Sequence, residues 1–98
     1  MVEHIVLFTV KDDLPREDAE DLVQSLRDLR GVVPGVVDLS VGENFSERSG
    51  GYTHGLFVRL RTHDDLQGYM QHPDHLAVVE KLEERTTGRI VVDYEHEV

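Results

Sequence analysis

The sequence predicts a single α+β domain in which a four-stranded antiparallel sheet carries its helices on one face. Four short segments are rich in β-branched and aromatic residues or alternate apolar with polar residues, as strands do. Two longer segments repeat apolar residues every three or four positions, as helices do. Their order is strand, helix, strand, strand, helix, strand. This is the ferredoxin-like, or split βαβ, arrangement, and the length allows one domain over residues 1–98.

The first two elements have clear signals. Residues 2–10 are dominated by β-branched and apolar side chains and predict a strand. A helix is predicted over residues 16–30, because apolar residues recur there at helical spacing and Pro15 suits a helix start. Acidic residues crowd its first turns and arginines its end, which favours the helix macrodipole. Gly31 then ends the helix.

The second half of the chain repeats the strand and helix signals. A histidine and a proline at positions 72–73 interrupt the second helical region, and the proline suits the first turn of the new segment. A Thr-Gly pair at 87–88 predicts a turn before the last strand. The predicted elements are strands over 36–41, 52–60 and 89–94 and a helical region over 64–85.

Alternation within the strands gives the predicted sheet two apolar faces. Both helices should cover the same face, because right-handed crossovers place them on one side. This face takes the apolar residues at even positions, Val6, Phe8, Leu56, Val58, Leu60, Ile90 and Val92. The other face takes Ile5, Leu7, Phe57 and Val91, together with the charged Glu3, Arg59, Arg61 and Asp93. A face this apolar is seldom left in water, so we expect a homodimer in which a second copy covers it.

The composition excludes several partners and sites. The formal net charge is −10, from 20 acidic and 10 basic residues, so we expect neither nucleic acid nor an anionic membrane as a partner. No apolar run reaches the roughly 20 residues of a membrane span, and the N-terminus lacks a signal-peptide pattern. No cysteine is present, which excludes thiol chemistry and thiolate metal sites. We expect a cytoplasmic protein.

Four polar side chains should point into the space between sheet and helices. His4 and His54 occupy helix-facing positions of the two central strands. His75 shares the apolar stripe of the second helical region, and Tyr69 lies shortly before it. Each histidine alone is compatible with a core residue bonded to a backbone carbonyl. Because buried polar groups without partners cost roughly 1–3 kcal/mol each, the convergence of four predicts a pocket for a polar ligand.

The histidines do not predict a transition-metal site. His72 and His75 have an H-x-x-H spacing, but Pro73 interrupts the helix between them and spoils their convergence on one ion. We therefore expect no metal and no cofactor. His72 is expected to cap the helix, whereas His63 and His96, near a loop and in the tail, are expected to be solvated.

Five motifs together resemble the stress-responsive α/β-barrel (Dabb) domain family, and they span nearly the whole chain. They are HIVLF at 4–8, PGV at 34–36, GYTHGL at 51–56, HPDH at 72–75 and VVDY at 91–94. The resemblance implies a dimeric α+β barrel, which agrees with the second apolar sheet face.

The resemblance also implies a chemistry. Plant polyketide cyclases of the family close a linear polyketide thioester by intramolecular aldol condensation, without a cofactor. On this resemblance His75 is the general base, Tyr69 binds and polarises the substrate carbonyl, and His4 and His54 line the pocket. Imidazole titrates near neutrality, and a phenol can hydrogen-bond a developing oxyanion.

Other hypotheses stay open beside a small-molecule-binding, cyclase- or lyase-like enzyme. One is a stress-response structural or binding dimer without turnover, because a fold does not fix a function. Another is a cofactorless monooxygenase of the same dimeric barrel superfamily; such proteins tend to use a tryptophan, and this chain has none. Some plant relatives are described with magnesium on main-chain carbonyls, which the resemblance would place at Arg30, Val33 and Val36.

Overall fold

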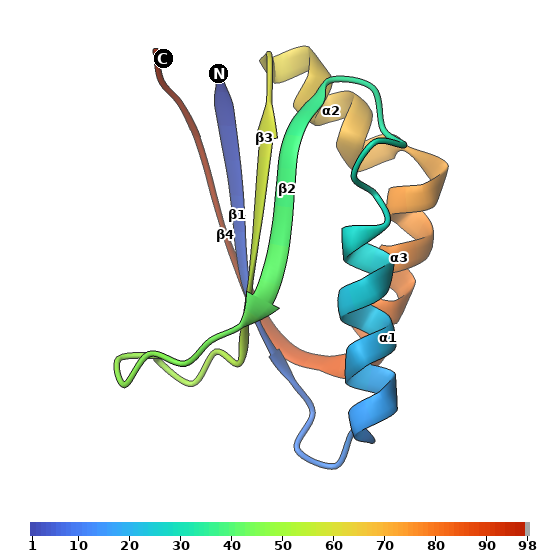
Figure 1. The fold of residues 1–98 in the computed structure, drawn as a ribbon, viewed down its shortest axis with the longest axis vertical. Helices are drawn as coiled ribbons and strands as arrows, with labels where there is room; N and C mark the ends of the chain where they lie inside the picture. Colours follow the sequence, from blue (N-terminus) through green and yellow to red (C-terminus); the bar gives the residue numbers. More distant parts are fainter. Residues whose placement is uncertain (98) are drawn as a thin grey trace.

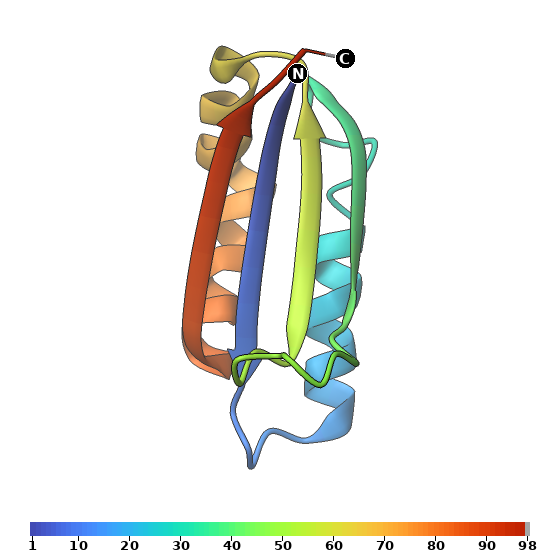
Figure 2. The ribbon, with the colours of Figure 1, turned by 90° about the vertical axis from the view of Figure 1, so that its left-hand side faces the viewer.

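The computed structural model describes residues 1–97 as one antiparallel sheet with all helices on one face (Figures 1 and 2). The strand order is β2-β3-β1-β4, which confirms the predicted ferredoxin-like fold. Residue 98, the last of the predicted domain, lies outside the described residues. The elements are β1 (Val2–Val10), α1 (Arg16–Arg27), β2 (Val36–Glu43), β3 (His54–Leu60), α2 (His63–Gln71), α3 (Pro73–Arg85) and β4 (Thr86–Glu95).

The first helix is shorter than predicted. α1 ends at Arg27 rather than at Arg30. The amides that follow form tighter turns, because Leu29 N–H donates to the Leu26 carbonyl and Arg30 N–H to the Arg27 carbonyl. Bonds between residues three apart satisfy the last carbonyls of a helix without continuing it.

The predicted turn at residues 87–88 is wrong, since β4 begins at Thr86 directly after α3. The Thr86 hydroxyl donates to the Leu82 carbonyl at 2.6 Å and so satisfies a carbonyl in the last turn of α3. The register of the β1–β4 ladder shifts between Thr9 and Val10, opposite this glycine-containing start of β4. The glycine therefore lies at a β-bulge, which is another common use of glycine in strands.

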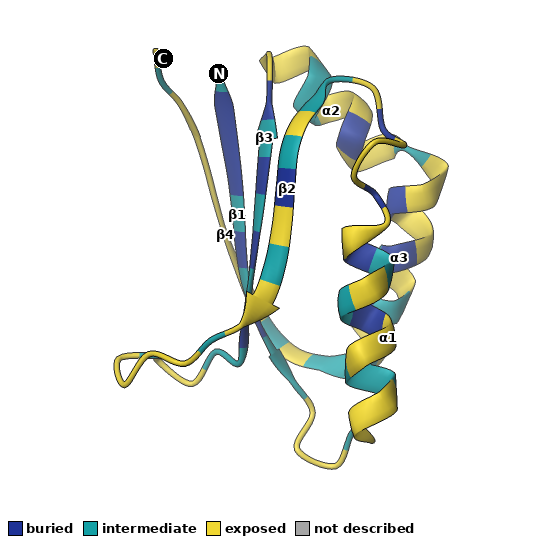
Figure 3. Ribbon diagram, viewed as in Figure 1, coloured by how far each residue is buried: buried dark blue, intermediate teal, exposed yellow. Residues whose placement is uncertain are grey.

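The core lies between the sheet and the helices, where buried side chains line the facing surfaces (Figure 3). Each of its central members has almost no exposed surface, and burying a residue of this size stabilises by roughly 1.5–3 kcal/mol. None of the helices within residues 1–97 is long and apolar enough to cross a membrane. The most deeply buried apolar side chains are Val2, Phe8, Leu22, Leu26, Leu39, Val58, Leu60 and Tyr69.

The predicted faces of β4 are wrong. Val91 lies directly opposite Val6 and so faces the helices, whereas Ile90 lies opposite Leu7 on the outer face. Val92 follows Ile90 to the outer face, and Asp93 lies opposite His4 on the helix side. Side-chain alternation holds along one strand, but an even position of β1 pairs with an odd position of β4. Whether a residue number is even or odd in one strand therefore does not predict the sheet face of the same parity in another strand.

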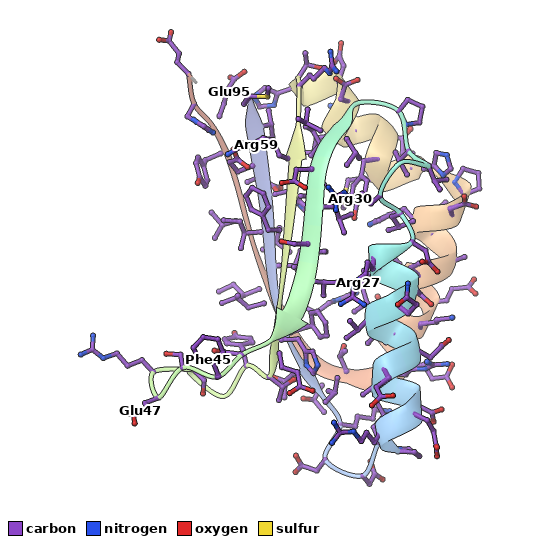
Figure 4. The ribbon with its side chains drawn as sticks, viewed as in Figure 1. Arg27, Arg30, Phe45, Glu47, Arg59 and Glu95 are labelled. Atoms are coloured by element: carbon purple, nitrogen blue, oxygen red, sulfur yellow. The ribbon has the colours of Figure 1, made fainter. Side chains whose placement is uncertain are left out.

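The outer face of the sheet is covered by no element of residues 1–97 (Figure 2). Ile90 and Val92 are about half exposed on it. Phe57 lies on the same face, across Ile5 of β1 from Val92, with the Arg59 guanidinium 5.6 Å from its ring centroid. Figure 4 shows Arg59 on the side of the sheet away from the helices. An uncovered apolar surface of this kind is typical of an interface.

One end of this outer face carries a buried carboxylate. Glu3 is 1% exposed and accepts hydrogen bonds from Arg59 at 2.7 Å and from His96 at 2.6 Å through the same oxygen. Burial alone would raise the pKa of Glu3, but these two hydrogen bonds outweigh it and hold the pKa below its ordinary value. The prediction that His96 is solvated is therefore wrong. Its N–H donates to the Met1 carbonyl, and its ring forms a hydrogen bond with Glu3.

Two glycines after α1 provide a matched stability test. Gly31 and Gly35 both have positive φ, of 80° and 86°. A Cβ at Gly31 would meet nothing within 4 Å, whereas one at Gly35 would run into the side chain of Asp65. We expect Gly31→Ala to lower the free energy of unfolding by about 1 kcal/mol from backbone strain alone. Gly35→Ala should cost clearly more, as measured by urea denaturation; equal losses would contradict the packing of Gly35 on α2.

Candidate active site

A cavity of about 210 Å³ lies between α3 and the sheet. Its walls are mainly apolar, and histidines from β1 and α3 line one part of it. Val91 lines it while remaining 49% exposed, so the cavity opens along the β4 edge of the sheet. The residues that line it are His4, Val6, Phe8, Leu26, Leu56, Met70, His75, Val78, Val79, Leu82, Arg89 and Val91.

Strand β1 positions His4, which is 3% exposed on the helix side of the sheet. Its Nδ1 lies 2.5 Å from Oδ1 of Asp93 on the neighbouring β4. A carboxylate can only accept a hydrogen bond, so Nδ1 carries the proton. Asp93 thus fixes the tautomer and orientation of the His4 ring. The sequence analysis missed this partner, which the β1–β4 register would have identified.

Helix α2 places Tyr69 in the deepest part of the core, with an exposed fraction of 0%. Its ring centroid lies 5.8 Å from that of His4 and 4.5 Å from that of His75. The hydroxyl has no hydrogen-bond partner among residues 1–97. Burial raises the pKa of Tyr69 to about 12, so the phenol stays protonated and can donate.

The interruption between α2 and α3 positions His75. The His72 ring accepts a hydrogen bond from the Asp74 N–H at 3.1 Å, which confirms the predicted capping role. In an unbroken helix that N–H would bind the carbonyl of Met70, four residues earlier. Here the Met70 carbonyl instead accepts the Nδ1 proton of His75 at 3.0 Å.

The bond to Met70 decides what His75 can do chemically. Because Nδ1 holds the proton of the neutral ring, Nε2 keeps its lone pair and can accept a proton from a ligand. Burial lowers the pKa of His75 below its ordinary value, against the hydrogen bond to Met70, which raises it. The ring is therefore neutral at pH 7, as a general base must be.

His54 lies apart from the other three polar residues. Its ring stacks on Phe8, with centroids 5.1 Å apart and planes 7° apart, and Nδ1 lies 2.8 Å from the Thr53 hydroxyl. His54 lines a separate groove under α1, beside Glu43. Burial is the main cause that holds the pKa of His54 below its ordinary value, against the nearby Glu43 carboxylate, which raises it. Figure 4 shows Arg27 over the same groove, where it donates to the Val41 carbonyl at 3.4 Å.

The structure thus brings together His4, Tyr69 and His75, with His54 across the Phe8 ring. Within residues 1–97 no three histidine, aspartate or glutamate side chains gather in a way that could hold a metal ion. Of the main-chain carbonyls considered for magnesium, that of Val33 accepts the Val36 N–H at 3.4 Å. The three converging residues have the composition of an acid–base site: a neutral imidazole, a neutral phenol and a carboxylate-bound imidazole.

Comparisons with known proteins identify the family of the chain. The family model "Stress responsive A/B Barrel Domain" matches residues 2–96. Stress-response A/B barrel domain-containing protein DABB1 of Arabidopsis thaliana is 31% identical over 96% of this chain, although the chain spans only 46% of that protein. Olivetolic acid cyclase of Cannabis sativa is 22% identical over 95% of this chain and 94% of its own length.

Solved structures show the same fold. A dimeric ferredoxin-like protein from Bacteroides fragilis has a TM-score of 0.79 and 30% identity, with 97% of this chain and 95% of that chain covered. Hydroxynitrile lyase from Passiflora edulis has a TM-score of 0.87 at 18% identity, with 95% and 90% covered. At that identity the second likeness shows the fold alone.

The unpartnered Tyr69 hydroxyl makes a stability prediction. Tyr69→Phe removes a buried polar atom without a partner, so it should raise the free energy of unfolding of the ligand-free protein by about 1 kcal/mol. Tyr52→Phe, at a partly exposed position in the loop before β3, is the control and should change stability little. Urea denaturation measures both, and a clear loss of stability in Tyr69→Phe would mean that the hydroxyl serves the fold.

Proposed function

The chain belongs to the stress-responsive A/B barrel domain family, and from this premise we propose that it is a cofactor-free, cyclase- or lyase-like enzyme. Its substrate is a small carbonyl compound that binds beside His4, Tyr69 and His75. One observation carries the proposal: within residues 1–97, a fully buried phenol without a hydrogen-bond partner packs against a neutral imidazole whose Nε2 makes no hydrogen bond. A core selected only for stability would have phenylalanine there, because the orphaned hydroxyl costs roughly 1–3 kcal/mol. A ligand carbonyl supplies the missing acceptor.

The proposed chemistry follows from the protonation states. His75 Nε2 removes a proton from the carbon next to the ligand carbonyl, and the electron pair of the broken C–H bond moves to the carbonyl oxygen. Tyr69 donates a hydrogen bond to the resulting enolate oxygen. The enolate carbon then attacks a second carbonyl of the same molecule, and the new alkoxide takes the proton held by His75. His4, oriented by Asp93, positions the ligand, and His54 binds its distal part if the ligand reaches past Phe8.

One relative supports this chemistry, whereas the cavity wall also leaves room for a second candidate. The relative named olivetolic acid cyclase is similar over nearly its whole length, so its activity provides a concrete substrate class, linear poly-β-ketoacyl compounds. The largely apolar wall also favours a second candidate, a dimer that binds a small apolar molecule without turnover. The proton-transfer residues separate the two, because retention without turnover requires only the apolar wall.

The catalytic roles make a kinetic prediction. With a linear poly-β-ketoacyl thioester as the probe, His75→Gln and Tyr69→Phe should each lower cyclisation about 10²- to 10⁴-fold, as followed by chromatography and mass spectrometry. His63→Gln, an exposed histidine on α2, is the matched control and should retain full activity. Absence of product with wild-type protein, together with tight binding of the probe, would favour the non-catalytic candidate.

The pKa of His75 adds a pH dependence. Burial lowers this pKa below the ordinary value of 6.5, so the neutral base persists at pH 6.5 and is lost only as the pH falls further. Protonation of His75 therefore opposes both activity and folding below pH 6.5, since the unfolded chain binds the proton more readily. We expect cyclisation to be constant above pH 7 and to fall only as the pH drops below 6.5. A rate that rises on acidification would contradict the role of His75 as a base.

The homodimer is the second part of the proposal, and the uncovered outer face and the dimeric relative of the same fold support it. Phe57→Asp places a charge at the centre of this face and should yield monomer or aggregate in sedimentation experiments. Leu76→Asp, at an exposed apolar position on α3, is the control and should sediment like wild type. Wild-type protein that sediments at about 11.2 kDa with full thermal stability would overturn the dimer.

A further inference from the structure

The proposed reaction uses only one end of the cavity, and the opposite end carries a cation. Arg89 lines the cavity from β4, directly opposite Phe8, whereas Asp93 lies opposite His4 in the same ladder. These two positions of β4 are four residues apart, which corresponds to about 13 Å of extended strand. The cavity is therefore a slot with His4 and His75 at one end, where Tyr69 packs against both rings, and a guanidinium at the other.

The Arg89 guanidinium has hydrogen-bond donors available for a ligand. Its side chain is 31% exposed, and its one hydrogen-bond partner among residues 1–97 is Oε1 of Glu83, 2.8 Å from one terminal nitrogen. A guanidinium has five N–H donors, so most of them are free. Glu83 is 66% exposed, and an ion pair this exposed holds its partners only weakly.

Within residues 1–97, no second charged side chain lines the cavity beside Arg89. Arg89 is the one lysine or arginine among the residues that line the cavity, and no carboxylate lines it. Asp93 is bound to His4 at the opposite end. Arg85, the nearest arginine along the chain, donates to the Asp18 carbonyl and to Asp21 on α1. A ligand anion near Arg89 would thus meet one cation and stay partly solvated at the open β4 edge, which limits its desolvation cost.

We propose that the cavity selects a medium-length carboxylic acid. The carboxylate of this ligand binds Arg89, and its carbonyl or hydroxyl lies at Tyr69 and His75. Its apolar middle contacts Val6, Phe8 and Leu82. This inference rests on the proposed function, which places the reactive group at the histidine end. The volume of about 210 Å³ corresponds to about seven water molecules at ~30 Å³ each, which suits such a chain. The planar guanidinium matches a carboxylate with two parallel hydrogen bonds.

Binding of two matched probes tests the inference. Octanoate and 1-octanol have the same chain and differ in the anionic group, and their affinities can be measured by isothermal titration calorimetry. Wild-type protein should bind octanoate more tightly than 1-octanol. Arg89→Gln should weaken octanoate about tenfold to a hundredfold and leave 1-octanol unchanged. Arg89→Lys should keep part of the octanoate affinity, and Glu83→Gln should raise it because the competing carboxylate is gone.

The outcomes separate this inference from the proposed function. Equal binding of both probes by wild type, or octanoate binding that Arg89→Gln leaves intact, would overturn the role of Arg89 while leaving the histidine end unaffected. Failure of both probes to bind would overturn this inference alone, because the cyclisation assay with the poly-β-ketoacyl thioester tests the proposed function separately. Circular dichroism of Arg89→Gln excludes misfolding, and Arg89→Lys provides a second variant with the charge retained.

Discussion

The hydrogen bond from the Asp74 N–H to the His72 ring is the contact on which the candidate active site depends. It ends α2, starts α3 and leaves the Met70 carbonyl free, so His75 can donate to that carbonyl and expose Nε2. Pro73, which lacks an N–H, fits the first position of the new helix without losing a bond. A continuous helix would pair Met70 with Asp74 and leave the His75 tautomer undefined.

Within residues 1–97, the two buried side-chain polar atoms that lack hydrogen-bond partners lie on opposite sides of the sheet. The Tyr69 hydroxyl is on the helix side, beside the cavity, and Oε2 of Glu3 is on the outer face, beside the surface assigned to the dimer. Each orphaned atom costs stability in the isolated chain. A small domain has little stability to spare, so atoms of this kind are expected where a ligand or a second subunit completes them.

Sequence patterns predicted the features that depend on a single segment, such as helix and strand positions. They failed for contacts that depend on how two segments are aligned. The element order, the break at His72 and the approach of Tyr69 to His75 follow from local signals, and all of them are observed. The pairing of Asp93 with His4 depends on the register between the first and last strands, which alternation alone does not fix. The separation of His54 depends likewise on how the Phe8 ring fills the space between two strands.

The direct passage from α3 into β4 has a mechanical consequence. Without a loop at Thr86, the helix and the strand on the two sides of the cavity form a stiff corner, closed by the bond from Thr86 to Leu82. Widening the cavity would bend this corner or break the ladder between β4 and β1. The backbone at Thr86 therefore sets the width of the slot, and a wider slot would require strain in this corner.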